Sequence, residues 1–183
     1  MGWYPILAQI TVAWFYSHLL EYFLHRFVLH NPRMLKGSWF RTHFAEHHNA
    51  ARKLQMVDPL YWSLKKVLKH PEAKGLFLLS VLHLPIAFFF PWAAATLTLS
   101  AASYYLIHRR AHVDTQWGRS WLPWHYDHHM APDQNVNWGV RLPLFDTLFG
   151  TKVLYKGTMK ETSDILRETA KANGIRSRSN QRR

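Results

Sequence analysis

The stretch WHYDHHM, residues 124 to 130, carries three of the 13 histidines in this chain. His125, His128 and His129 stand at positions i, i+3 and i+4, so a helix would present all three imidazoles on one face. Imidazole nitrogen is a good ligand for several transition metals. The spacing therefore predicts a helix with a metal-binding face, around which the other ligands must be arranged.

Three more histidine groups precede this stretch and bring the total to ten histidines in four short clusters. They are His25 and His30 in HRFVLH, His43, His47 and His48 in HFAEHH, and His108 and His112 in HRRAH. Ten neutral imidazoles exceed the needs of one metal and suffice for two metals with four or five ligands each. A structural zinc site would be complete with four. The excess predicts a redox centre that binds dioxygen, and iron is the expected metal.

The spacing inside the clusters predicts how the ligands divide. On a regular helix His25 and His30 would point about 140° apart, so they need a kink or a helix end between them to share a face. His43 and His47 would share a face, and His48 would be turned by about 100°. Two of these three ligands could therefore serve one metal while His48 turns toward another.

Composition and charge narrow the class of protein. The 183 residues include no cysteine, which excludes disulfides, thiolate ligands and iron–sulfur clusters. The net charge is +12, yet all 23 lysines and arginines lie in residues 26–74 and 109–183, and none lies in the apolar segments 1–25 and 75–108. The positive-inside rule predicts this separation for a membrane protein. Nucleic-acid binding, the alternative for a basic chain, gives no reason for it and predicts a soluble protein.

The apolar segments predict an all-α integral membrane protein with about three transmembrane helices. Residues 3–24 would form one span of roughly 30 Å, with the N-terminus outside. Residues 75–107 would form a hairpin of two short helices, Gly75 to Phe90 and Ala93 to Ile107. Each would be about 24 Å long, which is short for a span, so a hairpin that crosses the membrane only in part is an alternative. The histidine clusters and the C-terminus would be cytoplasmic, with the clusters in a helical cap.

Two further segments are predicted outside these spans. Residues 59–69 fit an amphipathic helix on the membrane surface, with a small soluble helix as the alternative. Residues 153–183 form a basic tail after a membrane domain of residues 1–152. The tail has one expected helix, with Ser163 as N-cap, Gly174 beyond its end, and disorder after it.

Several carboxylates are candidates to support the ligands. Glu21 lies one turn before His25 and is expected to accept its second ring N–H, with a plain interfacial glutamate as the alternative. Asp114 and Asp127 are candidate acceptors for other imidazole N–H groups. The remaining histidines are interpreted as structural or left outside the site: His18, His70 and His83.

In this order, EYFLHRFVLH, HFAEHH, HRRAH and HYDHH resemble the HxxxxH, HxxxHH, HxxxH and HxxHH boxes of the membrane fatty acid hydroxylase and sterol desaturase superfamily. NWG at 137–139 and LFDTLFGT at 144–151 also look like that family's motifs. The resemblance covers roughly residues 14–152, and the boxes are most similar to those of fatty acid 2-hydroxylases. Small carotenoid hydroxylases have a comparable size but a different third box.

The resemblance implies a non-haem di-iron oxygenase in which the ten clustered histidines hold two irons, for which zinc could substitute in purified protein. It implies hydroxylation of an unactivated C–H bond of a fatty-acyl, sterol-like or carotenoid lipid with dioxygen and two electrons. Desaturation by the same centre and a membrane metal-binding protein without oxygen chemistry are the alternatives. The expected partners are a lipid from the bilayer and a ferredoxin or b-type cytochrome with its reductase, and no nucleic acid. Asn137 matches an asparagine near the family's last box and could bind a metal-bound water, or it could be a turn residue.

Overall fold

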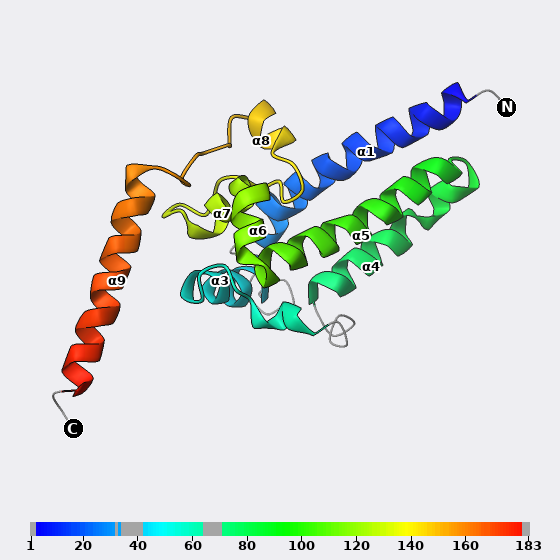
Figure 1. Ribbon diagram of the computed structural model, residues 1–183. Helices are drawn as coiled ribbons and strands as arrows, with labels where there is room; N and C mark the ends of the chain where they lie inside the picture. Colours follow the sequence, from blue (N-terminus) through cyan, green and yellow to red (C-terminus); the bar gives the residue numbers. More distant parts are fainter. Residues whose placement is uncertain (1–2, 32, 34–41, 64–70, 181–183) are drawn as a thin grey trace. The chain divides into compact units, whose positions relative to one another are not determined.

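The computed structural model describes residues 3–31, 33, 42–63 and 71–180 (Figure 1). Within these ranges it contains eight α-helices, joined in places by π- and 3₁₀-helical turns, and no β-strand. The predicted all-α class is therefore confirmed for this part of the chain. The chain divides into two compact units, Met1–Val153 and Leu154–Arg183.

Three long helices form the body of the first unit. They are α1 (Tyr4–Leu24), α4 (Pro71–His83) and α5 (Pro91–Val113), and α5 packs against both of the others (Figure 1). The turn η5 (Leu84–Phe88) connects α4 to α5 as a hairpin. A proline stands in the first turn of α1 and of α5, where its missing N–H costs no hydrogen bond. The N-terminal helix and the hairpin thus lie where the apolar segments predict helices.

The expectation of about three transmembrane helices needs correction. None of the helices in the described ranges combines the length and the apolar character that crossing a membrane requires. The helix α4 has only 13 residues, since its regular hydrogen bonding ends before Pro85. The longer α1 contains Gln9, Ser17, His18 and Glu21, which reduce its hydropathy.

The shorter elements gather around the end of the bundle at which α5 ends (Figure 1). Gly118 lets one of them approach α5 closely, because a Cβ at this position would lie 2.7 Å from the carbonyl oxygen of Ala111. Where a helix is expected over residues 59–69, the structure has a short 3₁₀ turn over residues 59–62. Residues 64–69 lie outside the described ranges. The shorter elements are η1 (His25–Leu29), η2 (Thr42–His48), α3 (Asn49–Lys53), η3 (Pro59–Trp62), α6 (Thr115–Trp121), α7 (Pro123–Met130) and α8 (Leu144–Leu148).

The second unit contains the helix α9 (Met159–Asn180). Its N-terminus is capped by Thr158, whose Oγ1 accepts a hydrogen bond from the backbone N–H of Glu161, while the Glu161 carboxylate accepts one from Gly157. The pair resembles a capping box, with Gly157 rather than Thr158 donating to Glu161, and it starts the helix before Ser163. The helix also continues through Gly174 to Asn180, so the predicted N-cap and the predicted end are wrong, and residues 181–183 of the segment predicted to be disordered lie outside the described ranges.

Candidate dimetal centre

Nine of the ten clustered histidines form two buried groups whose ring nitrogens lie within 4.8 Å of one another in each group. We call the first group cluster A and the second cluster B. The two groups are adjacent, because the rings of His48 in cluster A and His129 in cluster B have centroids 4.3 Å apart. Cluster A is His25, His30, His43, His48 and His128; cluster B is His47, His108, His112 and His129.

Two π-helical turns bring the first two histidine boxes together. A π-helix has i to i+5 hydrogen bonds, and the backbone N–H of His30 donates to the carbonyl of His25 in this pattern at 3.2 Å. In this wider turn, side chains five residues apart point closer to one face than on an α-helix, where they point about 140° apart. His25 therefore joins His30, and in η2 His43 joins His48, all in cluster A. The predicted division of the second box is wrong, because His48, rather than His47, joins His43 in cluster A.

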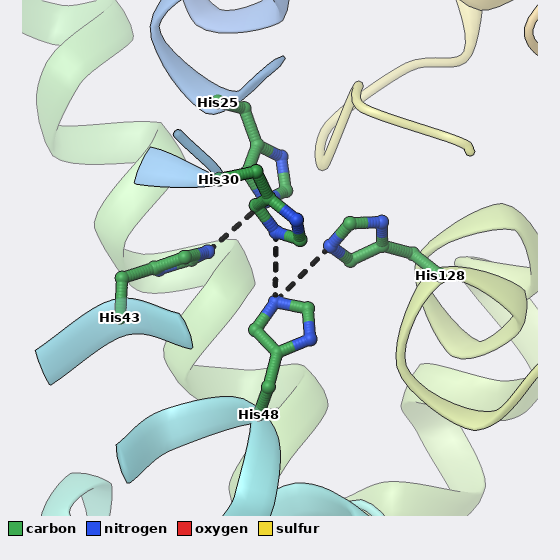
Figure 2. Close-up of side chains that lie close together, drawn as sticks. All are labelled: His25, His30, His43, His48 and His128. Atoms are coloured by element: carbon green, nitrogen blue, oxygen red, sulfur yellow. Dashed lines mark hydrogen bonds between the residues drawn. The ribbon is translucent and has the colours of Figure 1, made fainter. Parts of the chain in front are cut away.

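Cluster A has the nitrogen spacing of a coordination shell (Figure 2). The Nε2 atoms of His25 and His43 lie 3.1 Å apart, those of His30 and His48 lie 3.1 Å apart, and those of His48 and His128 lie 3.2 Å apart. Nitrogens bound to one metal at about 2.1 Å are separated by about 3.0 to 3.4 Å. The five rings converge from η1, its C-cap, η2 and α7, so the residues present fit a metal ion.

Cluster B is built on regular α-helical spacing. His108 and His112 lie one turn apart on α5, with their Nε2 atoms 3.2 Å apart. The Nε2 atom of His125, four residues before His129 on α7, lies 3.1 Å from that of His112, which makes His125 a fifth candidate ligand. The Nε2 atoms of His47 and His129 are buried and have no hydrogen-bond partner among the described residues. A metal ion would satisfy them.

Burial keeps the rings neutral, as ligation requires. Because the charged form is disfavoured away from water, the pKa of His25 falls to about 4 and that of His30 to about 2. For the same reason the pKa is lowered from 6.5 at every other member for which a shift is seen: His43, His47, His48, His112, His125, His128 and His129. Each neutral ring has a nitrogen lone pair available for a metal.

Backbone carbonyls orient two rings of cluster A. The Nδ1 atom of His25 donates to the carbonyl of Trp138 at 2.6 Å, and that of His128 donates to the carbonyl of Val136 at 2.7 Å. The fully buried Asp146 holds this segment by accepting hydrogen bonds from the backbone N–H groups of Trp138 and Gly139, both at 2.7 Å. The segment between α7 and α8 therefore fixes the Nδ1 side of these ligands and leaves Nε2 toward the metal position.

Carboxylates orient two rings of cluster B, and neither carboxylate was predicted from the sequence to belong to the site. Asp58 accepts from Nδ1 of His47 at 2.7 Å, and Glu72 accepts from Nδ1 of His108 at 2.5 Å. Tyr61 donates to the other Glu72 oxygen at 2.5 Å. Burial raises the pKa of Glu72, but His108 and the hydrogen bonds from His108 and Tyr61 outweigh this effect and lower the pKa to about 2. For Glu72, the sequence signal that could have indicated a role is its place just before the apolar segment 75–108.

The third oriented ring of cluster B depends on an unusual backbone. The Nδ1 atom of His112 donates to the carbonyl of Met56 at 2.7 Å. Met56 has a φ of 73°, in the left-handed region that residues with side chains rarely adopt. The preceding residue, Gln55, has a φ of 54°. The tertiary structure thus holds two strained residues next to a candidate ligand.

The predicted supporting residues have different contacts from those expected. Glu21 is buried but does not meet His25; it accepts from the backbone N–H of Arg141 at 3.0 Å and from its Nε at 2.7 Å. Asp114 is exposed and caps α6 by accepting from the N–H of Trp117. Asp127 is buried on α7, and a role in orienting a ligand stays a prediction for it.

Asn137 is a turn residue in the structure. It has a φ of 56°, and its side chain pairs with the backbone of Val153, donating to the carbonyl at 2.8 Å and accepting from the N–H at 2.9 Å. This pairing anchors the segment that contains Trp138. The alternative interpretation of Asn137 thus agrees with its contacts.

The histidines left outside the site lie away from the clusters or outside the described ranges. His83 bonds to the Tyr16 hydroxyl at 3.1 Å and donates to the Leu79 carbonyl at 2.7 Å. The Nδ1 atom of His18 lies 3.9 Å from the Glu21 carboxylate. His70 is not within the described residues.

A cavity of about 300 Å³ leads from the histidines between α1, α4 and α5. His25 and His43 of cluster A and His47 of cluster B line it, together with Glu72 at the start of α4 and His83 at its end. At about 1.5 Å per residue, those two positions are roughly 16 Å apart along the helix. Leucines make up much of the wall: Leu20, Leu24, Leu76, Leu79, Leu82 and Leu97. The cavity is therefore elongated and apolar, and it reaches both clusters.

We expect Glu21→Gln to lower the free energy of unfolding by about 3 kcal/mol, because the change leaves the buried Arg141 guanidinium without its counter-charge. Urea unfolding of the full chain measures this. The matched control is Asp164→Asn in the pair with Lys160, whose side chains are 27% and 59% exposed; asparagine keeps an acceptor oxygen, and the urea midpoint should change little. Equal midpoints for Glu21→Gln and wild type would show that the Glu21–Arg141 pair does not stabilise the fold.

Comparison with known proteins assigns the chain to a family. The family described as fatty acid hydroxylase matches residues 10–151, a range that includes all ten clustered histidines. No curated protein and no solved structure matches the chain. The match covers most of the chain, and the two buried clusters fit a dimetal centre. The chain belongs to the fatty acid hydroxylase family and is a non-haem di-iron oxidoreductase.

Proposed function

We propose that this enzyme hydroxylates an unactivated C–H bond in the hydrocarbon chain of a fatty-acyl lipid. The observation that carries the proposal is the elongated, leucine-lined cavity that ends at His25, His43 and His47, members of both clusters. A long apolar cavity that reaches the metal positions fits a linear chain, and apolar lining is the usual character of such binding sites. Family membership alone does not choose among lipid substrates.

The reaction is a monooxygenation, in which R–H, O₂, two electrons and two protons give R–OH and H₂O. Two irons in clusters A and B would supply the activation of dioxygen. The chain's own residues hold the ligands in place, keep bulk water away from the site, and orient one carbon of the substrate toward the clusters. The leucines of the cavity supply this orientation through apolar burial.

We infer a membrane as the source of the substrate from the exposed apolar side chains of the three-helix bundle. Phe88 and Phe89 at the hairpin are 88% and 80% exposed, Phe77 on α4 is 71% exposed, and Leu99 on α5 is 70% exposed. Apolar surface on this scale marks interaction with another apolar phase. A bundle whose hairpin enters a lipid layer would give the cavity access to acyl chains.

The two electrons would come from an external carrier. Three basic residues near the clusters are exposed: Lys53 at the end of α3, Arg110 in the last turn of α5, and Arg119 on α6. A basic surface favours docking of an acidic redox protein, so a ferredoxin or a b-type cytochrome with its reductase is the expected donor. We expect no turnover with dioxygen alone; product formation without an added reductant would contradict this part of the proposal.

The test is mass spectrometry of total lipids from cells that express the chain, compared with cells that express His48→Ala. A fatty-acyl lipid that gains one oxygen only with the wild-type chain would support hydroxylation. A loss of two hydrogens would identify a desaturase instead. Two bound metals with no change in any lipid, even with reductant added to the purified enzyme and acyl lipids, would favour a metal-binding protein without oxygen chemistry.

A further inference from the structure

The two histidine clusters differ in what accepts their Nδ1 protons. In cluster A the acceptors for His25 and His128 are the neutral carbonyls of Trp138 and Val136. In cluster B, His47 donates to the carboxylate of Asp58, and His108 donates to that of Glu72. Two ligands of cluster B thus donate directly to carboxylates, whereas these two ligands of cluster A donate to neutral peptide carbonyls.

This difference matters because the carboxylates are shielded from solvent. The Asp58 side chain is 1% exposed and that of Glu72 is 13% exposed. A carboxylate that accepts the Nδ1 proton draws that proton toward itself, which makes the opposite nitrogen a stronger electron donor to a metal. In a buried site of low effective dielectric, the negative charge also attracts a bound cation more strongly than it would in water.

We propose that the two metal positions are unequal, and that Asp58 and Glu72 make cluster B the tighter site and the one that favours ferric over ferrous iron. Both effects have one origin, since negative charge near the metal stabilises a higher positive charge on it. Asp58 and Glu72 are positioning residues that act through His47 and His108. The inference rests on metal binding by the clusters and does not require a particular lipid.

The first test is iron release from the full-length, iron-loaded protein during dialysis against increasing chelator concentrations. We expect two release steps in the wild type. Glu72→Gln keeps an acceptor oxygen but removes the charge, and it should weaken the tighter step by about 10- to 100-fold while the weaker step stays unchanged. The matched control is Glu168→Gln, which removes the charge of an exposed carboxylate on α9 that does not line the cavity, and it should leave both steps in place. Asp58→Asn is the second variant if Glu72→Gln does not fold.

Variants that disable one cluster at a time show which cluster gives rise to each iron-release step. His128→Ala disables cluster A and should leave the tight step, whereas His129→Ala disables cluster B and should leave the weak one. Mössbauer spectra of protein loaded with ⁵⁷Fe should show two quadrupole doublets, of which Glu72→Gln shifts only one. Equal release steps, the reverse assignment, or a Glu72→Gln spectrum identical to that of the wild type would overturn the inference alone. Protein that binds no iron would overturn the proposed function as well.

Discussion

Replacing His48 with alanine is expected to remove the metal from cluster A and to reduce lipid oxidation to background. The Nε2 atom of His48 lies within 3.2 Å of those of both His30 and His128, so it is the central nitrogen of the cluster (Figure 2). Loss of a ligand should lower the metal affinity of that site by more than about 100-fold, beyond the effect of removing a supporting hydrogen bond. Metal analysis should find one iron per chain where the wild type binds two.

The matched control for this change is His83→Ala, which removes an imidazole bonded to Tyr16 and Leu79 rather than to a cluster. It should retain two irons per chain. Far-UV circular dichroism checks that His48→Ala keeps its helices, because metal loss can unfold a metalloprotein. If folded His48→Ala still binds two irons, His48 is not a ligand and the arrangement of cluster A must be different.

Replacing Ala101 with tryptophan is expected to abolish hydroxylation of long acyl chains while both metals remain bound. Ala101 lines the cavity on α5, seven residues before His108, which places it about 10 Å from the cluster end along the helix. A large ring at this position would fill the path of a long chain, whereas a chain that ends before it would still fit. Turnover of acyl substrates of increasing length, with iron content measured in parallel, tests this expectation.

Leu97→Trp extends the same test, because Leu97 lines the cavity one turn farther from the clusters. It should therefore exclude only substrates longer than those that Ala101→Trp excludes. The matched control is Ala102→Trp, an exposed position beside Ala101 that does not line this cavity. If Ala101→Trp turns over long chains at the wild-type rate, the cavity between α1, α4 and α5 is not the substrate site.

The sequence alone predicted the chemistry of the site from residue type and number. Ten histidines in four groups, with no cysteine, already favoured two metals on nitrogen ligands, because few other roles for so many imidazoles exist in one domain. Helical periodicity also predicted correctly that His108 and His112 share a face, since α5 is a regular α-helix. Hydropathy placed α1 and the hairpin but overstated them as membrane spans.

Only the tertiary structure decided which histidines belong to which cluster and what supports them. Two histidines five residues apart do not share a face of an α-helix. Nothing local in the sequence indicates that η1 and η2 adopt π-helical hydrogen bonding, in which the ligands converge. The partners of the rings are also distant in the chain: Glu72 meets His108, and Trp138 meets His25. Such contacts depend on how separate helices pack, because a side chain at a known position on one helix does not specify which neighbour faces it. The sequence therefore identified the candidate ligands, and packing determined how they divide into two clusters and which groups accept their Nδ1 protons.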